Sequence, residues 1–208
     1  MKRDTPVTCH HQDAADPSER DVRHDLLPLA LAPWATRIQY APVVVRRASP
    51  RDLARVAQLH GRCSARSLLD RYRSGGRPPS AIALDAALRA DRTFVATTRE
   101  GAAVAVATLR RDPRHNARCA EVAVLVEDRW QRKGLGGDLI AHLAGVAQVL
   151  GYTELIGYPG TAVAAAQRLM LAVGRTRMVP NPGDPHLHTY LSAEAALGLG
   201  SVRERLAG

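Results

Sequence analysis

The chain has 208 residues, of which 46% are apolar and only 4% are aromatic. This length favours one domain with some additional chain, and the apolar content supports a core of Ala, Val and Leu and excludes wholesale disorder. No apolar run approaches the roughly 20 residues of a membrane span. The N-terminal residues also lack the apolar segment of a secretory signal, so we expect a cytoplasmic protein with no membrane partner.

The charge is unevenly distributed. Lysine and arginine total 29 against 20 acidic residues, which gives a formal net charge of +9. Residues 1–40 hold five basic and six acidic side chains, so the positive charge belongs to the rest of the chain. A basic domain favours an anionic partner, either nucleic acid or a phosphorylated cosubstrate. We find no helix-turn-helix pattern, zinc ligands or aromatic stacking strand, and we therefore expect no nucleic-acid partner.

The three cysteines, Cys9, Cys63 and Cys119, are widely spaced. Such an odd and sparse set predicts neither a disulfide framework nor paired metal ligands. The run Cys9-His10-His11 lies in a polar segment with no second ligand cluster nearby, so we predict no metal site.

The chain divides into three parts. Residues 1–40 are polar and aperiodic apart from an apolar stretch over 26–32, which predicts a poorly ordered extension. The domain is predicted over residues 41–192, and residues 193–208 form a C-terminal tail.

The first half of the domain predicts a strand followed by helices. A β-branched strand covers 43–45. Ser49-Pro50-Arg51-Asp52 then combines an N-cap serine, a helix-starting proline and an acid in the first turn, which predicts a helix. A second helix follows Ser64, the glycines and prolines of 74–79 end it, and Ser80 caps a short third helix.

The second half changes from the helical to the strand period and back. The strands and helices predicted from these patterns are a hairpin at 93–98 and 102–109, a strand at 120–126, a helix at 134–150, a strand at 153–157, a helix from Thr161 to Gly174, and strands at 175–179 and 186–191. This order predicts an α/β (α+β) domain with one mixed sheet covered by helices.

One segment of this pattern carries chemistry. The strand ending at Val126 runs into a glycine-rich turn, Gly134-Leu135-Gly136-Gly137, that opens the long helix. The first amides of a helix have no intrahelical acceptor and lie at the positive end of its dipole, so this unit predicts a phosphate site, to which Arg132 and Lys133 add charge. A purely structural turn is the alternative. The segment lacks the third glycine of a dinucleotide fingerprint and the Gly-Lys-Ser/Thr of a Walker loop.

The run Gln131-Arg132-Lys133-Gly134-Leu135-Gly136 resembles the Q/R-x-x-G-x-G/A signature of the GNAT superfamily of N-acetyltransferases. The resemblance covers about residues 43–192 and is strongest over 120–150, where the strand is similar to the bacterial protein-lysine acetyltransferase branch. It implies the GNAT-like acyl-CoA N-acyltransferase fold, with a single, mostly antiparallel sheet, and acetyl-CoA as cosubstrate.

The resemblance also implies a cosubstrate site. The pantetheine arm would pair with the strand backbone, the amides of residues 132–137 would bind the pyrophosphate, and the thioester would lie in a splay between the strand of Val126 and the strand at 153–157. The implied binding residues are Val124, Leu125, Val126, Gln131, Arg132, Lys133, Gly134, Leu135, Gly136 and Gly137.

Acetyl transfer needs a base, because only a neutral amine attacks a thioester. Glu121 interrupts an apolar strand and resembles the glutamate of the protein-acetylating relatives, so we expect it to be the general base; a solvated strand residue is the alternative. The Val126 amide would stabilise the oxyanion.

The family's helix tyrosine, the acid for the leaving thiolate, has no counterpart in residues 167–174. Either the thiolate leaves without an acid, or another residue serves. Tyr158, His188 and Tyr190 are the substitutes that we consider, and a structural role is the alternative for each.

The sequence leaves the acceptor open between a protein lysine and a small amine. A non-catalytic acyl-CoA-binding regulatory module of the same fold is a further alternative. A homodimer is compatible with the sequence but is not predicted by any motif.

Overall fold

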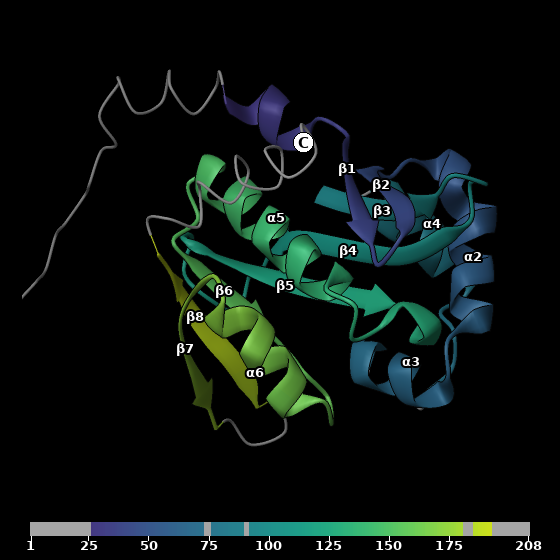
Figure 1. The fold of residues 1–208 in the computed structure, drawn as a ribbon. Helices are drawn as coiled ribbons and strands as arrows, with labels where there is room; N and C mark the ends of the chain where they lie inside the picture. The colour runs from purple at the N-terminus through teal and green to yellow at the C-terminus, as the bar shows by residue number, and fades with distance from the viewer. Residues whose placement is uncertain (1–25, 73–75, 90–91, 181–184, 193–208) are drawn as a thin grey trace, which may run out of the picture.

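The computed structural model describes residues 26–72, 76–89, 92–180 and 185–192. Within these residues the strands form one sheet in the order β1-β2-β3-β4-β5-β6-β8-β7 (Figure 1). Every neighbouring pair is antiparallel except β5 and β6. The strands are β1 (Trp34–Ile38), β2 (Ala41–Arg47), β3 (Arg92–Thr98), β4 (Ala103–Arg111), β5 (Cys119–Val126), β6 (Glu154–Gly157), β7 (Gly174–Val179) and β8 (His186–Leu191). The predicted single, mostly antiparallel sheet is confirmed.

Helices cover both faces of the sheet. Besides the helical residues 26–31, the described helices are η1 (Pro50–Asp52), α2 (Leu53–Arg62), α3 (Ala65–Tyr72), α4 (Ala81–Arg89), η2 (Asp128–Trp130), α5 (Leu135–Val149) and α6 (Val163–Leu171). Helix α5 packs on β4 and β5, and α6 packs on β7 and β8, whereas α2 and α3 contact β4 and β5 from the other side. The predicted helices therefore all form, with ends close to those expected.

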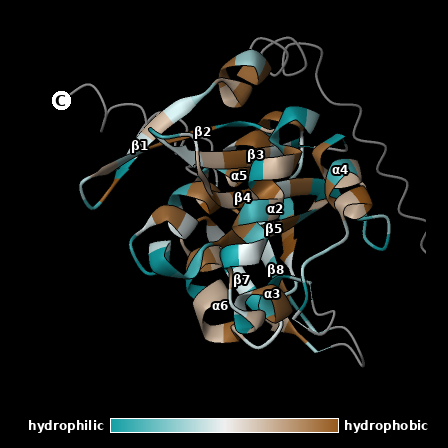
Figure 2. Ribbon diagram, turned by 90° about the vertical axis from the view of Figure 1, so that its right-hand side faces the viewer, coloured by the Kyte–Doolittle hydropathy of each residue, from teal (hydrophilic) through white to brown (hydrophobic). Residues whose placement is uncertain are grey.

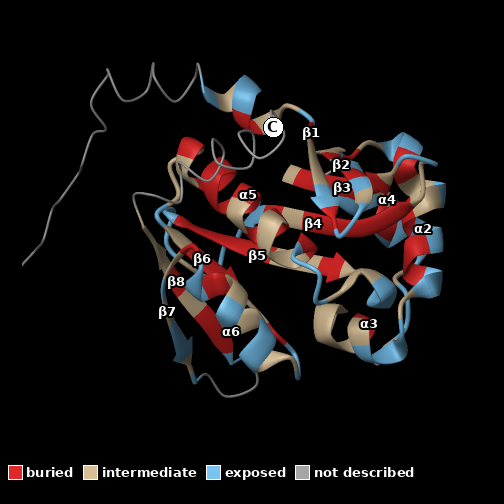
Figure 3. Ribbon diagram, in the orientation of Figure 1, coloured by how far each residue is buried: buried red, intermediate tan, exposed pale blue. Residues whose placement is uncertain are grey.

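The central strands are buried on both faces because helices cover both (Figure 3). Alternate residues of β5 enter different cores: Val122 packs with the α5 side, and Leu125 packs with α2 and α4. Helix α5 itself is mostly buried, and the ring of His142 on it contacts Phe94 edge-on, with 4.7 Å between ring centroids. Colouring by hydropathy shows the same apolar centre (Figure 2).

The ordered chain begins earlier than predicted. Residues 26–31 are helical, and β1 pairs with β2 in the register Trp34↔Val45. Trp34 and Ile38 are buried, and the polar Thr36 between them donates a 3.0 Å hydrogen bond from its hydroxyl to the Asp138 carboxylate on α5. The prediction of a poorly ordered extension was therefore wrong for residues 26–38, because an inward-facing threonine hides the apolar alternation of a five-residue strand.

Three predicted features lie outside the described residues. They are residues 1–25, with the Cys9-His10-His11 run, and the tail at 193–208, together with part of the loop between β7 and β8. The boundaries 1–40, 41–192 and 193–208 stay predictions in these parts of the chain.

Candidate functional site

Strands β5 and β6 separate as they run. They pair in parallel only from Cys119↔Glu154 to Glu121↔Ile156, and beyond that point they diverge (Figure 1). A cavity of about 550 Å³ opens where they part, bounded by the end of β5, the start of α5, and faces of α3 and α6. The splay that the sequence analysis placed between these strands is therefore present.

The backbone of β5 offers unpaired polar groups to this cavity. The Glu127 amide donates to the Val104 carbonyl at 2.9 Å. The amide of Leu125, two residues earlier on β5, therefore also points toward β4. In an antiparallel pair the intervening residues point their amides the other way. The amides of Val124 and Val126 therefore face the gap, where β6 no longer accompanies β5.

The loop before α5 presents a second set of amides. Arg132 has φ 58° and Gly134 has φ 98°, so the chain turns twice through the left-handed region before the helix begins at Leu135. Within the described residues, the amide nitrogens from Arg132 to Gly137 donate to no backbone carbonyl, and no side chain caps the helix. A concave row of free amides at a helix N-terminus is the arrangement that binds phosphates.

Gln131 holds this loop against β5. Its side-chain amide donates to the Val126 carbonyl and to the Ser67 hydroxyl, both at 2.9 Å. The Asp128 carboxylate accepts hydrogen bonds from the Ser64 amide at 2.8 Å and from its hydroxyl at 2.6 Å. These contacts join the start of α3 to the loop, so the amides are fixed before any ligand arrives.

The structure brings most of the predicted binding residues to one wall. Those that line the cavity are Val124, Leu125, Val126, Gln131, Arg132, Gly134, Gly136 and Gly137. Two predicted residues do not line it: the Leu135 side chain is fully buried in the core, and Lys133 lines a separate hollow beside Tyr40 and Trp130. For Leu135 the first helical turn points its side chain inward.

Sequence reasoning missed the opposite walls. Ser67, Asp70 and Arg71 line the cavity from α3, and Ala166 and Leu169 line it from α6. The polar side chains of α3 were the available signal, but their place depends on how α3 docks on β5.

Glu121 lies beside the cavity rather than in its wall. It is 9% exposed, and its Oε2 accepts hydrogen bonds from Arg110 Nε at 3.0 Å and Nη2 at 2.7 Å. Arg114 approaches the same oxygen at 3.8 Å. The residues that follow Glu121 in β5, Val122 and Ala123, line the cavity. The carboxylate is thus an ion-paired group adjacent to the cavity, and the alternative of a freely solvated residue is wrong.

A second buried carboxylate, Asp112, anchors the loop after β4. Burial raises the pKa of Asp112, but hydrogen bonds from the side chain and amide of Arg114 and from the Tyr158 hydroxyl outweigh burial and hold that pKa at about 2. Tyr158 lines the cavity and donates to Asp112 at 2.9 Å. Of the three alternative acids, Tyr158 alone is placed at the cavity wall within the described residues; His188 and Tyr190 stack on each other in β8.

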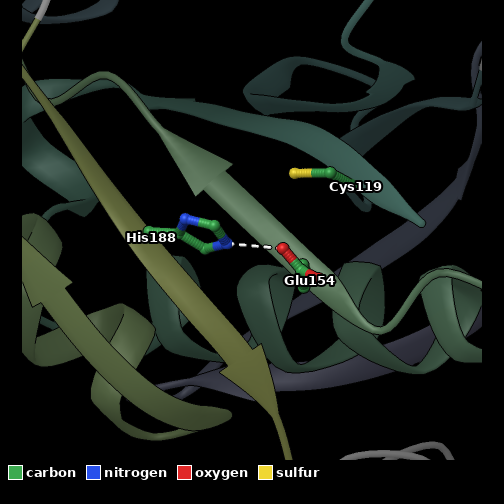
Figure 4. A group of neighbouring side chains, drawn as sticks. All are labelled: Cys119, Glu154 and His188. Atoms are coloured by element: carbon green, nitrogen blue, oxygen red, sulfur yellow. Dashed lines mark hydrogen bonds and ion pairs between the residues drawn. The ribbon is translucent and has the colours of Figure 1, made fainter. Parts of the chain in front are cut away.

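Cys119, Glu154 and His188 form a compact group on the same sheet face (Figure 4). Their potential ligand atoms lie within 4.8 Å of one another, and His188 Nε2 is 2.7 Å from Glu154 Oε2. Burial raises the pKa of the Cys119 thiol to about 12, with the Glu154 and Asp112 carboxylates adding to the effect. In the structure this group consists of an imidazole–carboxylate hydrogen bond beside a buried thiol.

Comparison with known proteins identifies the family. Residues 63–174 match the family model described as the acetyltransferase (GNAT) family, which is more than half of the chain. The chain belongs to the acetyltransferase (GNAT) family. The matched residues run from the end of α2 to the start of β7 and include the whole cavity wall of β5 and α5. The resemblance carried by residues 131–136 is confirmed.

Solved structures show the same GNAT fold. The GNAT domain of S. lividans PAT is 22% identical, with a TM-score of 0.65, and the match covers 76% of this chain and 97% of that one. A phosphinothricin acetyltransferase from Sinorhizobium meliloti, in complex with acetyl-CoA, is 20% identical with a TM-score of 0.55 over 72% and 89%. Diaminobutyrate acetyltransferase EctA from Paenibacillus lautus, with L-2,4-diaminobutyric acid and coenzyme A, is 19% identical with a TM-score of 0.54 over 73% and 96%.

No curated protein matches the sequence of this GNAT chain. Among the described residues, no helix combines the length and apolar character that crossing a membrane requires.

Proposed function

We propose that this chain is an acetyl-CoA-dependent N-acetyltransferase that acetylates a primary amine. One observation carries the proposal: two rows of unpartnered backbone amides face a single cavity. One row belongs to the loop and first turn at Arg132–Gly137, and the other belongs to Val124 and Val126 on β5. A ligand that satisfies both must be anionic at one end and amide-bearing along its length.

The cavity fits acetyl-CoA on these grounds. The free amides and the Arg132 side chain offer positive potential to a diphosphate. The β5 edge can pair with the amides of the pantetheine arm as an added strand would. The part of the wall toward α5 and α6 includes the apolar residues Ile140, Ala166 and Leu169, which reduce the access of water to a thioester on that side.

Acetyl-CoA supplies an activated acyl group. The neutral amine attacks the thioester carbonyl carbon, the carbon–sulfur bond breaks, and CoA leaves as a thiolate. Glu121 accepts the proton of the amine, directly or through a water; this assignment is supported by its place on β5, directly before Val122 and Ala123, which line the cavity. The Val126 amide donates to the oxygen that becomes negative in the tetrahedral intermediate.

The Tyr158 hydroxyl, at the cavity wall, is our candidate for returning a proton to the thiolate. The role is not essential for turnover, since a thiol with a pKa of about 8.5 leaves without full protonation.

The test is direct and has two stages. Acetyl-CoA at 100 times its Kd should raise the melting temperature by about 5–10 °C, because a ligand that binds only the folded state stabilises it. Pantetheine, which lacks the phosphates, should raise it far less. Release of free thiol with a panel of primary amines then separates an enzyme from a silent CoA-binding module. No shift with acetyl-CoA would reject the site, and a shift without thiol release would support the non-catalytic module.

A further inference from the structure

Arg71 on α3 carries an unpaired charge into the wall of the cavity. Its Nη2 donates to the Thr108 hydroxyl on β4 at 3.2 Å, and its guanidinium carbon lies 4.7 Å from the centroid of the Tyr72 ring. Its Nε is buried and has no hydrogen-bond partner. Among the described residues, no carboxylate lies within ion-pair distance of Arg71.

The carboxylates nearby are already neutralised. Glu121 accepts two hydrogen bonds from Arg110, and Asp112 accepts hydrogen bonds from Arg114 at 3.0 Å. Two carboxylates thus face three arginines in this corner of the molecule, and Arg71 is the arginine left over.

The preceding residue, Asp70, does not neutralise Arg71 either. One of its oxygens is 3.3 Å from Arg66 Nε, and the other accepts hydrogen bonds from the amide and hydroxyl of Thr161. Burial lowers the pKa of Arg71, opposed by Tyr72 and Glu121, yet a guanidinium stays protonated in proteins. Arg71 is partly buried, and its Nε is fully buried without a hydrogen-bond partner. A cation placed in this way without an ion pair is costly, so its position in the cavity wall points to an anionic ligand.

Two anionic parts of the reaction are accounted for elsewhere. The loop amides at Arg132–Gly137 face the diphosphate, and the Val126 amide faces the developing oxyanion. CoA carries one more anionic group, the 3′-phosphate, but that group belongs to the nucleotide end of the molecule, whereas Arg71 feels the charge of Glu121, the base we propose. The acceptor must approach Glu121, so an anionic group on the acceptor is the partner that remains for Arg71. We propose that Arg71 binds a carboxylate carried by the amine acceptor, which makes the acceptor a small amino-acid-like molecule. This inference rests on the proposed function.

The experiment compares acceptors that differ only in this carboxylate. Lysine is tested against lysinamide and cadaverine, and the other common amino acids are tested against their amides, with acetyl-CoA saturating. An arginine–carboxylate pair should favour the acid member of a productive pair by about 10- to 100-fold in kcat/KM. Arg71→Met should abolish this preference by lowering kcat/KM for the acid members to about the level of their amides.

Stability and cosubstrate binding provide readouts that do not depend on turnover. Arg71→Met should raise the melting temperature of the free protein, because it replaces a partly buried cation that has no ion pair by an apolar side chain of similar length. It should weaken acetyl-CoA binding by a smaller factor than it weakens the preference for acid acceptors. Arg66→Met is the matched control, since Arg66 lies on the same helix with its side chain 67% exposed, and it should keep the preference.

The outcomes separate this inference from the proposed function. Equal use of acids and amides, preferential acetylation of lysine side chains in peptides, or an equal loss of kcat for all acceptors in Arg71→Met would each overturn the carboxylate-binding role. Such results would still show an active acetyltransferase. Failure of acetyl-CoA to bind the wild-type protein would instead overturn the proposed function itself.

Discussion

Arg110 and Glu121 face each other across β4 and β5, and the guanidinium places both of its hydrogen bonds on a single carboxylate oxygen, Oε2. This pairing holds the carboxyl group beside the cavity, and in the role that we propose for Glu121 it leaves Oε1 to accept the proton. A base held in this way is oriented without being enclosed, because the Arg110 side chain is itself 56% exposed.

Glu121→Gln tests this role. The amide keeps the shape of the side chain but cannot accept the amine proton, so kcat should fall by about 10²- to 10⁴-fold while the acetyl-CoA Kd stays the same. Steady-state thiol release and calorimetry measure the two quantities. Glu154→Gln on the neighbouring strand is the control and should retain most of the activity. An unchanged kcat in Glu121→Gln would remove Glu121 from the mechanism.

Gly136 allows a test of the anion site by charge alone. A Cβ there would lie 3.6 Å from Leu169 Cδ1, an ordinary contact, so both Gly136→Asn and Gly136→Asp fit. Asp in the first turn of α5 stabilises the helix by about 0.3–1 kcal/mol relative to Asn, yet it repels a diphosphate. We therefore expect Gly136→Asp to melt higher than Gly136→Asn and to bind acetyl-CoA at least 10-fold more weakly. Equal affinities for the two variants would show that the phosphates lie elsewhere.

The ion pair of Asp52, which lies outside the cavity, should make the free energy of unfolding depend on pH. Hydrogen bonds from Arg46 lower its pKa to about 2, against the opposing effect of burial and with help from the Ser49 amide. Because this pKa is below the unfolded value of about 3.9, the stabilisation is complete above pH 4 and disappears as the pH falls to about 2. Asp52→Asn should cost about 1–2 kcal/mol of unfolding free energy at pH 7, after allowance for the partly exposed Arg46.

Urea unfolding at pH 7 and at pH 2.5 measures this difference, which should shrink at the lower pH. Asp85→Asn, in an exposed pair with Arg89, is the control and should change little at either pH. A pH-independent effect of Asp52→Asn would contradict the assignment to its ion pair.

The cysteines should not carry the acetyl group. Burial raises the pKa of Cys63 to about 11, with Asp128 and Glu127 adding to the effect, and burial likewise raises the pKa of Cys119 to about 12. Only the thiolate is nucleophilic, so both thiols should resist iodoacetamide at pH 7 in the folded protein, and Cys63→Ser should keep its turnover. Peptide mass spectrometry measures the modification of Cys63 and of Cys119 separately. Acetyl transfer to Cys63 on incubation with acetyl-CoA would argue for a covalent intermediate.

The features that could be predicted from the sequence are those set by residues close together along the chain. The alternation of β5, the glycines at 134–137 and the period of α5 are local signals, and together they located the loop that we propose binds the phosphates. The sequence could not predict the Arg110–Glu121 pair, because that contact depends on the register across the loop at 112–118. It missed Arg71 for the same reason, since the position of α3 is set by tertiary packing on β5.

Two other differences have simple physical causes. Lys133 follows the left-handed Arg132, and the turn directs its side chain to the hollow beside Tyr40 rather than to the cavity. Strand β1 depends on its partner: five residues with an inward threonine carry no strand pattern until β2 pairs with them. Sequence alternation therefore finds strands whose inner face is wholly apolar and overlooks strands fixed by one polar contact.

The central claim is that free amides at Arg132–Gly137 and on the edge of β5 bind acetyl-CoA. An ¹⁵N-labelled sample titrated with acetyl-CoA tests it residue by residue. We predict that the amide resonances of Gly134, Gly136 and Gly137 shift most, together with those of Val124 and Val126, and that 3′-phosphoadenosine diphosphate shifts the glycines alone. If acetyl-CoA leaves these amides unmoved while resonances elsewhere change, the coenzyme binds at another place and the account is wrong.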